Sequence, residues 1–119
     1  MRRIVLFLLA TVVLTSCRRY EFRSPGVTIT TMNDSRQPVS TIEVDYPGGS
    51  YGIGSIAPGS RHVRWIKVTG SAPLRIDFTD SKGEHQAKPL TLNAGESGVV
   101  VLHIHDDATV TVEDGRVKK

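Results

Sequence analysis

The residues best suited to chemistry are two histidines, His103 and His105, which stand two positions apart. Alternate side chains of a strand point to the same face, so the two imidazoles could share one metal ion. A metal site usually takes roughly three or four protein ligands, and only His62 and His85 remain as further nitrogen donors. The pair therefore predicts either a metal-binding or redox site, or two polar residues where a strand emerges from the core.

A second candidate is the glycine-rich segment around Gly52 and Gly54. A phosphate-binding loop would need a strand before it and a helix after it, and the surrounding sequence predicts no helix. Near Tyr46, and together with Tyr51 and Trp65, these glycines could form a shallow aromatic surface that binds a glycan or a peptide of an envelope protein. Packing of the aromatic rings in the core is the favoured interpretation.

No residue pattern of an enzyme is recognisable. Cys17 is the only cysteine, and no serine has the strand-to-helix setting of a hydrolase nucleophile. Paired carboxylates such as Glu43 with Asp45 fall on the polar side of an expected strand. Aromatic residues make up 6% of the chain, which is little material for a deep ligand pocket. The sequence predicts a non-catalytic protein without a cofactor.

The first residues differ from the rest of the chain. Arg2 and Arg3 precede an apolar run from Ile4 to Leu14. That run is shorter than the roughly 20 residues that span a bilayer and fits the apolar region of a signal peptide. A single thiol in an exported protein cannot close an internal disulfide, and it would risk pairing between molecules if it stayed free.

The four residues Leu14, Thr15, Ser16 and Cys17 resemble the lipobox of bacterial lipoproteins. The resemblance implies a cleaved signal peptide over 1–16, a lipidated Cys17 that holds the protein on a membrane, and a tether over 17–25. It also implies placement in the outer membrane where the host has one, because Arg18 is not the aspartate that retains lipoproteins at the inner membrane. Otherwise the protein is expected on the outer face of the cytoplasmic membrane.

The net charge of the mature chain argues against nucleic acid as a partner. The full sequence has 15 basic and 12 acidic residues, and Arg2 and Arg3 leave with the signal peptide. The remaining 13 basic residues exceed the acidic ones by one. Such a chain has no strong positive field to attract phosphates.

From Val27 onward, β-branched residues alternate with polar ones between short turns, which predicts an all-β fold. We expect a small antiparallel β-sandwich of about seven or eight strands over 26–115, followed by a frayed tail over 116–119. That number of short strands suggests an immunoglobulin-like or transthyretin-like sandwich. The turns around Pro58 and Gly95 resemble the strand-to-strand turns of secreted sandwich domains. Between Arg61 and Val68 the apolar residues change parity, which predicts a β-bulge or a switch from one sheet to the other near Trp65.

Two functions remain open at this point. The first is a non-catalytic, lipid-anchored envelope protein that binds a partner through a sheet edge or the glycine-rich strand. The alternative is a metal-binding or redox protein that uses His103 and His105.

Overall fold

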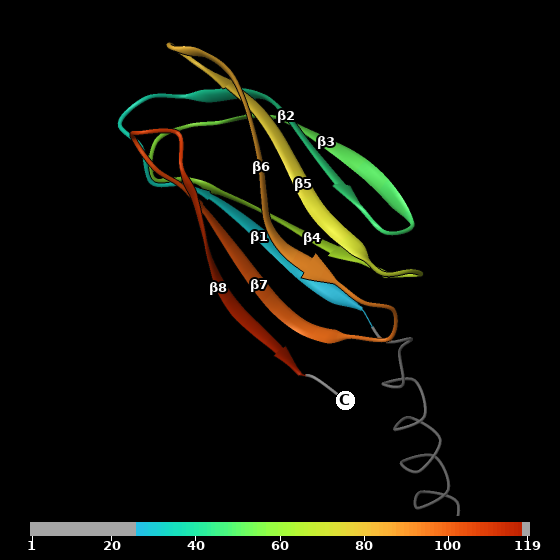
Figure 1. Ribbon diagram of the computed structural model, residues 1–119. Helices are drawn as coiled ribbons and strands as arrows, with labels where there is room; N and C mark the ends of the chain where they lie inside the picture. Colours follow the sequence, from blue (N-terminus) through green and yellow to red (C-terminus); the bar gives the residue numbers. More distant parts are fainter. Residues whose placement is uncertain (1–25, 118–119) are drawn as a thin grey trace, which may run out of the picture.

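The computed structural model describes residues 26–117, which form eight β-strands in two layers (Figure 1). The strands are β1 (Val27–Asn33), β2 (Val39–Tyr46), β3 (Gly49–Ile56), β4 (Arg61–Ile66), β5 (Ala72–Asp80), β6 (Gly83–Leu92), β7 (Ser97–Ile104) and β8 (Val110–Val117). The expected small β-sandwich is confirmed. The signal peptide, Cys17 and the tether lie outside the described residues. No helix in the described part is long and apolar enough to cross a membrane.

Each layer is a four-stranded sheet. The strand order is β4-β1-β7-β8 in sheet A and β3-β2-β5-β6 in sheet B. Within these sheets β1 and β7 run parallel, whereas the other paired strands run antiparallel. The expectation of a purely antiparallel sandwich therefore needs one correction, at the centre of sheet A. Between β1 and β7 the chain crosses to sheet B, so β7 can return to sheet A in the same direction as β1.

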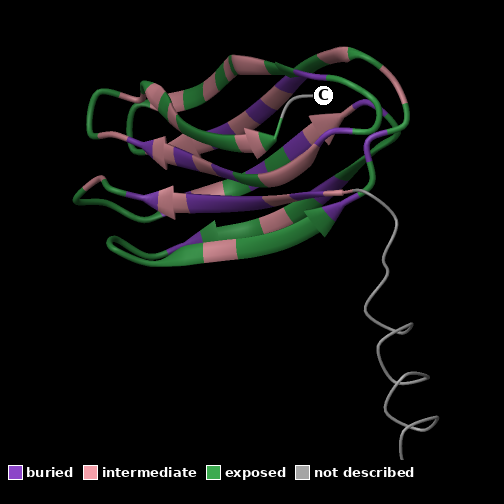
Figure 2. Cartoon of the chain, turned by 90° about the horizontal axis from the view of Figure 1, so that it is seen from below, coloured by how far each residue is buried: buried purple, intermediate pink, exposed green. Residues whose placement is uncertain are grey.

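The core lies between the two sheets, where alternate residues of β2, β5 and β7 are buried (Figure 2). Ile42 and Val44 of β2 and Leu74, Ile76 and Phe78 of β5 are at most 2% exposed. These are the faces that the period-two pattern predicts to be apolar. Further fully buried side chains come from sheet A, namely Val27, Ile29, Val100, Leu102 and Ile104.

Of the two alternatives near Trp65, the bulge is wrong, whereas the chain does leave sheet A after Ile66 and enters sheet B with β5. The pairing of β1 with β4 is regular from Val27 with Ile66 to Met32 with Arg61. Ile66 points into the core, and Val63 and Trp65 instead face outward, 55% and 48% exposed. Strand β4 therefore has apolar residues on both of its faces, which explains why the apolar pattern of the sequence changes parity there. Trp65 is not a core residue, in contrast to the favoured interpretation.

The final strand ends at Val117, beyond the expected end of the sandwich at residue 115. The strand includes Arg116, whose side chain is only 6% exposed and is fixed by hydrogen bonds. Its guanidinium donates to the carboxylates of Glu96 and Asp114 and to the backbone oxygen of Thr91. A charge-assisted network of this kind ties β8 to the turn that precedes β7.

One buried amide joins the two sheets at the end where β1 finishes. Asn33 is 0% exposed, and its Nδ2 donates to the backbone oxygens of Gln37 (2.7 Å) and Ile56 (2.9 Å). Its Oδ1 accepts from the backbone nitrogen of Ser35 (2.9 Å) and from the Ser35 hydroxyl (2.5 Å). Every hydrogen-bonding position of the side chain is used, so its burial is compensated.

Replacing Asn33 by alanine should lower the free energy of unfolding by about 2 to 3 kcal/mol, because the carbonyls of Gln37 and Ile56 lose their donor in a buried setting. Urea denaturation of the mature domain measures this change. Gln37→Ala is the matched control, since the Gln37 side chain is exposed and only its backbone joins the network. A loss below about 0.5 kcal/mol for Asn33→Ala, the level of an ordinary surface change, would contradict this account.

Candidate functional site

The two histidines of the predicted metal site lie side by side. His103 is on β7 and His105 directly follows it, and their rings stack with centroids 6.3 Å apart. Both rings already have partners. The Nδ1 atom of His103 is 2.6 Å from Oδ2 of Asp34, and the Nε2 atom of His105 is 2.7 Å from the Thr111 hydroxyl. The spacing of two therefore places the imidazoles together, as the strand geometry predicts.

The other two histidines lie elsewhere. His62 pairs with Thr31 across β4 and β1, on the inner face of sheet A, whereas His103 is on the outer face. His85 is in sheet B, where its Nε2 is 2.8 Å from Oδ1 of Asp80. This hydrogen bond holds the pKa of Asp80 below its usual value. Within residues 26–117, no group of three or more histidine, cysteine, aspartate or glutamate side chains could hold a metal ion.

The four residues of the predicted binding surface are not brought together. Tyr51 points inward from β3 and is 6% exposed. Gly52 and Gly54 are exposed on the same strand. Trp65 lies on the outer face of sheet A, away from the space between the sheets into which Tyr51 points. A single aromatic platform that includes both Tyr51 and Trp65 is therefore not present.

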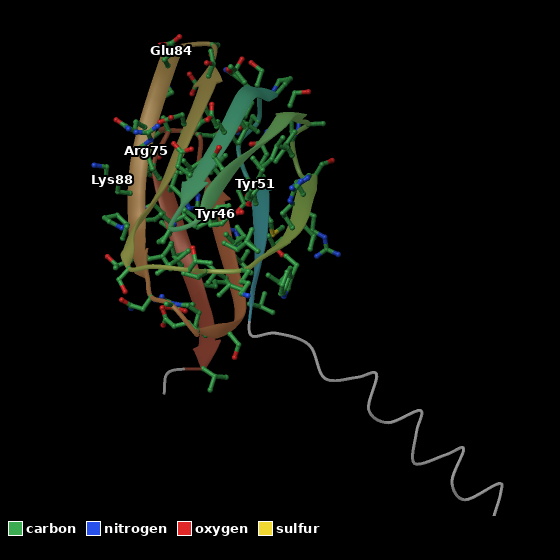
Figure 3. The ribbon with its side chains drawn as sticks, turned by 90° about the vertical axis from the view of Figure 1, so that its right-hand side faces the viewer. Tyr46, Tyr51, Arg75, Glu84 and Lys88 are labelled. Carbon is green, nitrogen blue, oxygen red and sulfur yellow. The ribbon has the colours of Figure 1, made fainter. Side chains whose placement is uncertain are left out.

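A different aromatic cluster closes the sandwich where β3 and β4 form neighbouring edges (Figure 3). The Tyr51 ring lies 6.1 Å from the ring of Tyr46 and 6.1 Å from that of His62. The Arg64 guanidinium stands 5.0 Å from the centre of the Tyr51 ring, within the range of a cation–π contact. The period-two spacing of His62 and Arg64 indicates only that they share a face of β4. It does not indicate that they lie beside Tyr51, so these two neighbours were missed.

This cluster contains buried polar atoms without a partner among the described residues, namely the Tyr51 hydroxyl and Nδ1 of His62. Burial raises the pKa of Tyr51 well above its usual value of 10.0, and the nearby Arg64 charge only partly opposes that shift. The phenol is therefore neutral throughout the physiological range. The neutral, buried phenol packs against the rings of Tyr46 and His62.

The edge strand β3 differs from the other three edges of the sandwich. Charged residues occur in β4 (Arg61, Arg64), in β8 (Glu113, Asp114, Arg116) and in β6 (Glu84, Lys88), and β6 also contains Pro89. The sequence of β3, GSYGIGSI, has neither a charge nor a proline. Charges and prolines are the usual means by which proteins prevent further strands from pairing at an edge. β3 is the unprotected edge of the described domain.

The outer face of sheet B carries a shallow polar groove of about 490 Å³ across β2, β5 and β6. Glu43, Asp77 and Glu84 line it together with Arg75. Arg75 donates to Asp45 (2.5 Å) and lies 3.3 Å from Asp77. Figure 3 shows Arg75, Glu84 and Lys88 on the side of the molecule away from Tyr46 and Tyr51. This groove lacks the apolar lining that small-molecule pockets usually have.

Replacing Tyr51 by phenylalanine tests the unpartnered hydroxyl. At pH 7 the variant should be as stable as the wild type or up to about 1 kcal/mol more stable, since a buried hydroxyl without a partner is a cost. The wild type should lose stability above about pH 10, because the unfolded phenol then ionises while the folded one remains neutral. The variant should lose about 1 kcal/mol less between pH 8 and pH 11.

Urea denaturation at pH 7, 8 and 11 provides the measurement, and Tyr46→Phe is the matched control on a ring that is only half-buried. A loss of more than about 1 kcal/mol at pH 7 for Tyr51→Phe would mean that the hydroxyl has a hydrogen-bond partner after all.

Comparison with protein families supports the lipid anchor. Residues 1–17 match the family described as "Prokaryotic membrane lipoprotein lipid attachment site". The match ends at Cys17, the residue expected to carry the lipid. The protein is thus a lipid-anchored, membrane-associated protein of the cell envelope. No curated protein sequence gave a significant match.

Among solved structures, the sandwich is similar to the "NMR structure of the protein from Eubacterium rectale". The two share 16% sequence identity and align with a TM-score of 0.54, over 74% of this chain and 86% of the other. At this level of identity the similarity establishes the fold alone.

Proposed function

We propose that this protein is a non-catalytic adaptor of the bacterial envelope, which is held on the membrane by lipid on Cys17 and binds an extended segment of a partner protein at β3. The partner segment would add a fifth strand to sheet B. Main-chain hydrogen bonds supply the affinity in this mode of recognition, and side chains on alternate positions supply the specificity.

The observation that carries the proposal is the unprotected edge. Alternate residues of an edge strand direct their N–H and C=O groups away from the sheet, where water or another strand must pair with them. The register of β2 with β3 is continuous from Tyr46 with Gly49 to Glu43 with Gly52, and it shifts next to Ile42. The regular half of β3, from Gly49 to Gly52, is therefore the part that offers a straight template.

The glycines of β3 keep this edge open. A side chain at Gly49 would place its Cβ 2.9 Å from the Tyr46 hydroxyl, so only glycine fits without displacing that ring. At Gly52 the nearest atom to an added Cβ is the Ile42 backbone oxygen, 3.9 Å away, so the absence of a side chain leaves room for an approaching strand. Glycine within a strand commonly marks such a close approach of another backbone.

Two further features support this function over catalysis and over metal chemistry. The groove of sheet B has its carboxylates partly neutralised by Arg75, and the buried Tyr51 phenol stays protonated. His103 and His105 provide two ligands, and no described residue adds the third that a metal site usually needs. Arg18, which follows the lipidated Cys17, favours the outer membrane in hosts that have one.

Site-specific photo-crosslinking in cells tests the adaptor function. A photoreactive amino acid at Ser50 of β3 in the full-length lipoprotein should form a discrete adduct with one envelope protein, whereas the same amino acid at Gln86 of β6 should not. Gly52→Lys should abolish the Ser50 adduct, because an edge lysine disfavours strand pairing. Gln86→Lys is the matched control, which adds the same charge on the opposite edge of sheet B.

A Ser50 adduct that persists in Gly52→Lys, or equal adducts from both edges, would overturn strand addition at β3. An adduct that vanishes upon removal of envelope glycans would point to a glycan instead of a protein. Cys17→Ser removes the lipidation site and shows whether the partner requires the membrane-anchored form.

A further inference from the structure

The large apolar side chains that remain exposed in the described domain all lie on the outer face of sheet A. They are Val63 and Trp65 of β4, Val99 of β7 and Val117 of β8, with exposures of 55%, 48%, 46% and 63%. We call these four residues the Trp65 patch. Their gathering on one face is notable, because exposed apolar residues are usually scattered.

The strand register makes the patch continuous. Trp65 pairs with Thr28, and Thr28 pairs with Val99, so the three side chains form one row across the sheet. Val63 belongs to the next row, with Thr30 and Val101. Val117 pairs with Ser97, two positions before Val99 on the same face. The patch therefore covers the end of sheet A at which β1 begins.

The same end receives the membrane tether. The Trp65 indole lies so closely over Gly26 that a Cβ at that position would be 2.3 Å from the ring. Gly26 is the residue at which the tether meets the sandwich. Figure 1 shows that β1 starts and β8 finishes at this end, whereas the turn between β5 and β6 is at the other. The patch thus lies beside the point at which the tether joins the domain.

The tether is short. Residues 17–25 separate the lipidated Cys17 from Gly26, and nine residues reach at most about 30 Å when fully extended. As a flexible chain they would span about 17 Å on average. The bilayer surface is therefore always within reach of the patch, at a high effective concentration. Even a small apolar surface can bind under that condition.

Basic residues flank the described domain in the sequence. Arg18, Arg19 and Arg23 lie in the tether, and Lys118 and Lys119 directly follow Val117. Basic residues near a membrane are attracted to anionic lipid headgroups. By contrast, the groove on the outer face of sheet B is lined by Glu43, Asp77 and Glu84. On the outer face of sheet A, the exposed Glu113 pairs with Val101, in the row of Val63, and its Oε1 is 3.3 Å from Nε2 of His103.

We propose that the Trp65 patch rests on the bilayer that carries the lipid anchor, with the indole at the level of the headgroups. Tryptophan prefers this interfacial region, because its ring is apolar while its N–H can still be hydrated. Sheet B and its acidic groove then face away from the membrane. This orientation goes beyond the adaptor function and holds whatever partner β3 binds.

Trp65 is the only tryptophan of the chain, so its fluorescence reports the patch directly. The full-length lipidated protein should be reconstituted in vesicles of phosphatidylcholine and phosphatidylglycerol, with or without brominated phosphatidylcholine. We expect quenching by the brominated lipid and a blue-shifted emission. We also expect about a twofold lower accessibility to acrylamide than in the unlipidated Cys17→Ser protein without vesicles, since a half-exposed indole loses its solvent side.

Val99→Glu places a charge beside Trp65 in the same row and should remove the quenching by brominated lipid while the protein stays anchored. Val117→Glu is a second variant with the same expectation, at a strand end where the fold tolerates change more readily. Gln86→Glu is the matched control, because it adds one negative charge to the exposed outer side of sheet B. It should leave the quenching unchanged.

Equal acrylamide accessibility with and without vesicles, or no effect of brominated lipid, would overturn the proposal. Shielding that grows with the protein-to-lipid ratio and is insensitive to brominated lipid would mean that a second copy of the chain covers the patch, which overturns it as well. If Gln86→Glu abolished the quenching as fully as Val99→Glu does, the loss would be a nonspecific effect of charge. That result would exclude docking by this face.

Discussion

The arrangement of this domain depends on one buried amide. Asn33 ends β1 of sheet A, and its side chain donates to the end of β3 in sheet B and to the loop that leads into β2. Its backbone nitrogen and oxygen bond Ser60 and Gly59, in the turn that returns the chain to sheet A. Apolar packing alone would allow the sheets to slide, because it has no direction. The hydrogen bonds of Asn33 select one relative position of the layers.

Once the layers are fixed, each exposed surface of the sandwich acquires a different character. The outer face of sheet A is apolar near the tether, the groove of sheet B is acidic, and of the four edge strands β3 alone lacks charges and proline. Arg116 keeps β8 in place at the end of the domain opposite Asn33, through Glu96 and Asp114. A small domain with one core can in this way present separate surfaces to a lipid layer and to a protein.

Much of the fold could be predicted because the period-two pattern of β2 and β5 marks their buried faces directly. The pattern is the same for parallel and antiparallel neighbours, so the pairing of β1 with β7 could not be inferred from it. Trp65 was wrongly predicted to lie in the core, because the prediction assumed that an apolar aromatic side chain is buried. For the candidate site, the spacing of His103 and His105 sufficed to place them together, whereas the contact of Tyr51 with His62 joins two strands and is invisible in local sequence.

The parallel pairing of β1 and β7 also affects when the protein can fold. Thr28 finds its neighbour Val99 only after most of the chain is available, and closing so large a loop delays the central contact of sheet A. β1, the first strand of the domain to be exported, is thus among the last strands to pair with both of its neighbours. Sheet B consists of β2, β3, β5 and β6 and can pair earlier, whereas sheet A also needs β7 and β8 from the last quarter of the chain. The topology thereby makes the completion of sheet A wait for the last part of the chain to cross the membrane.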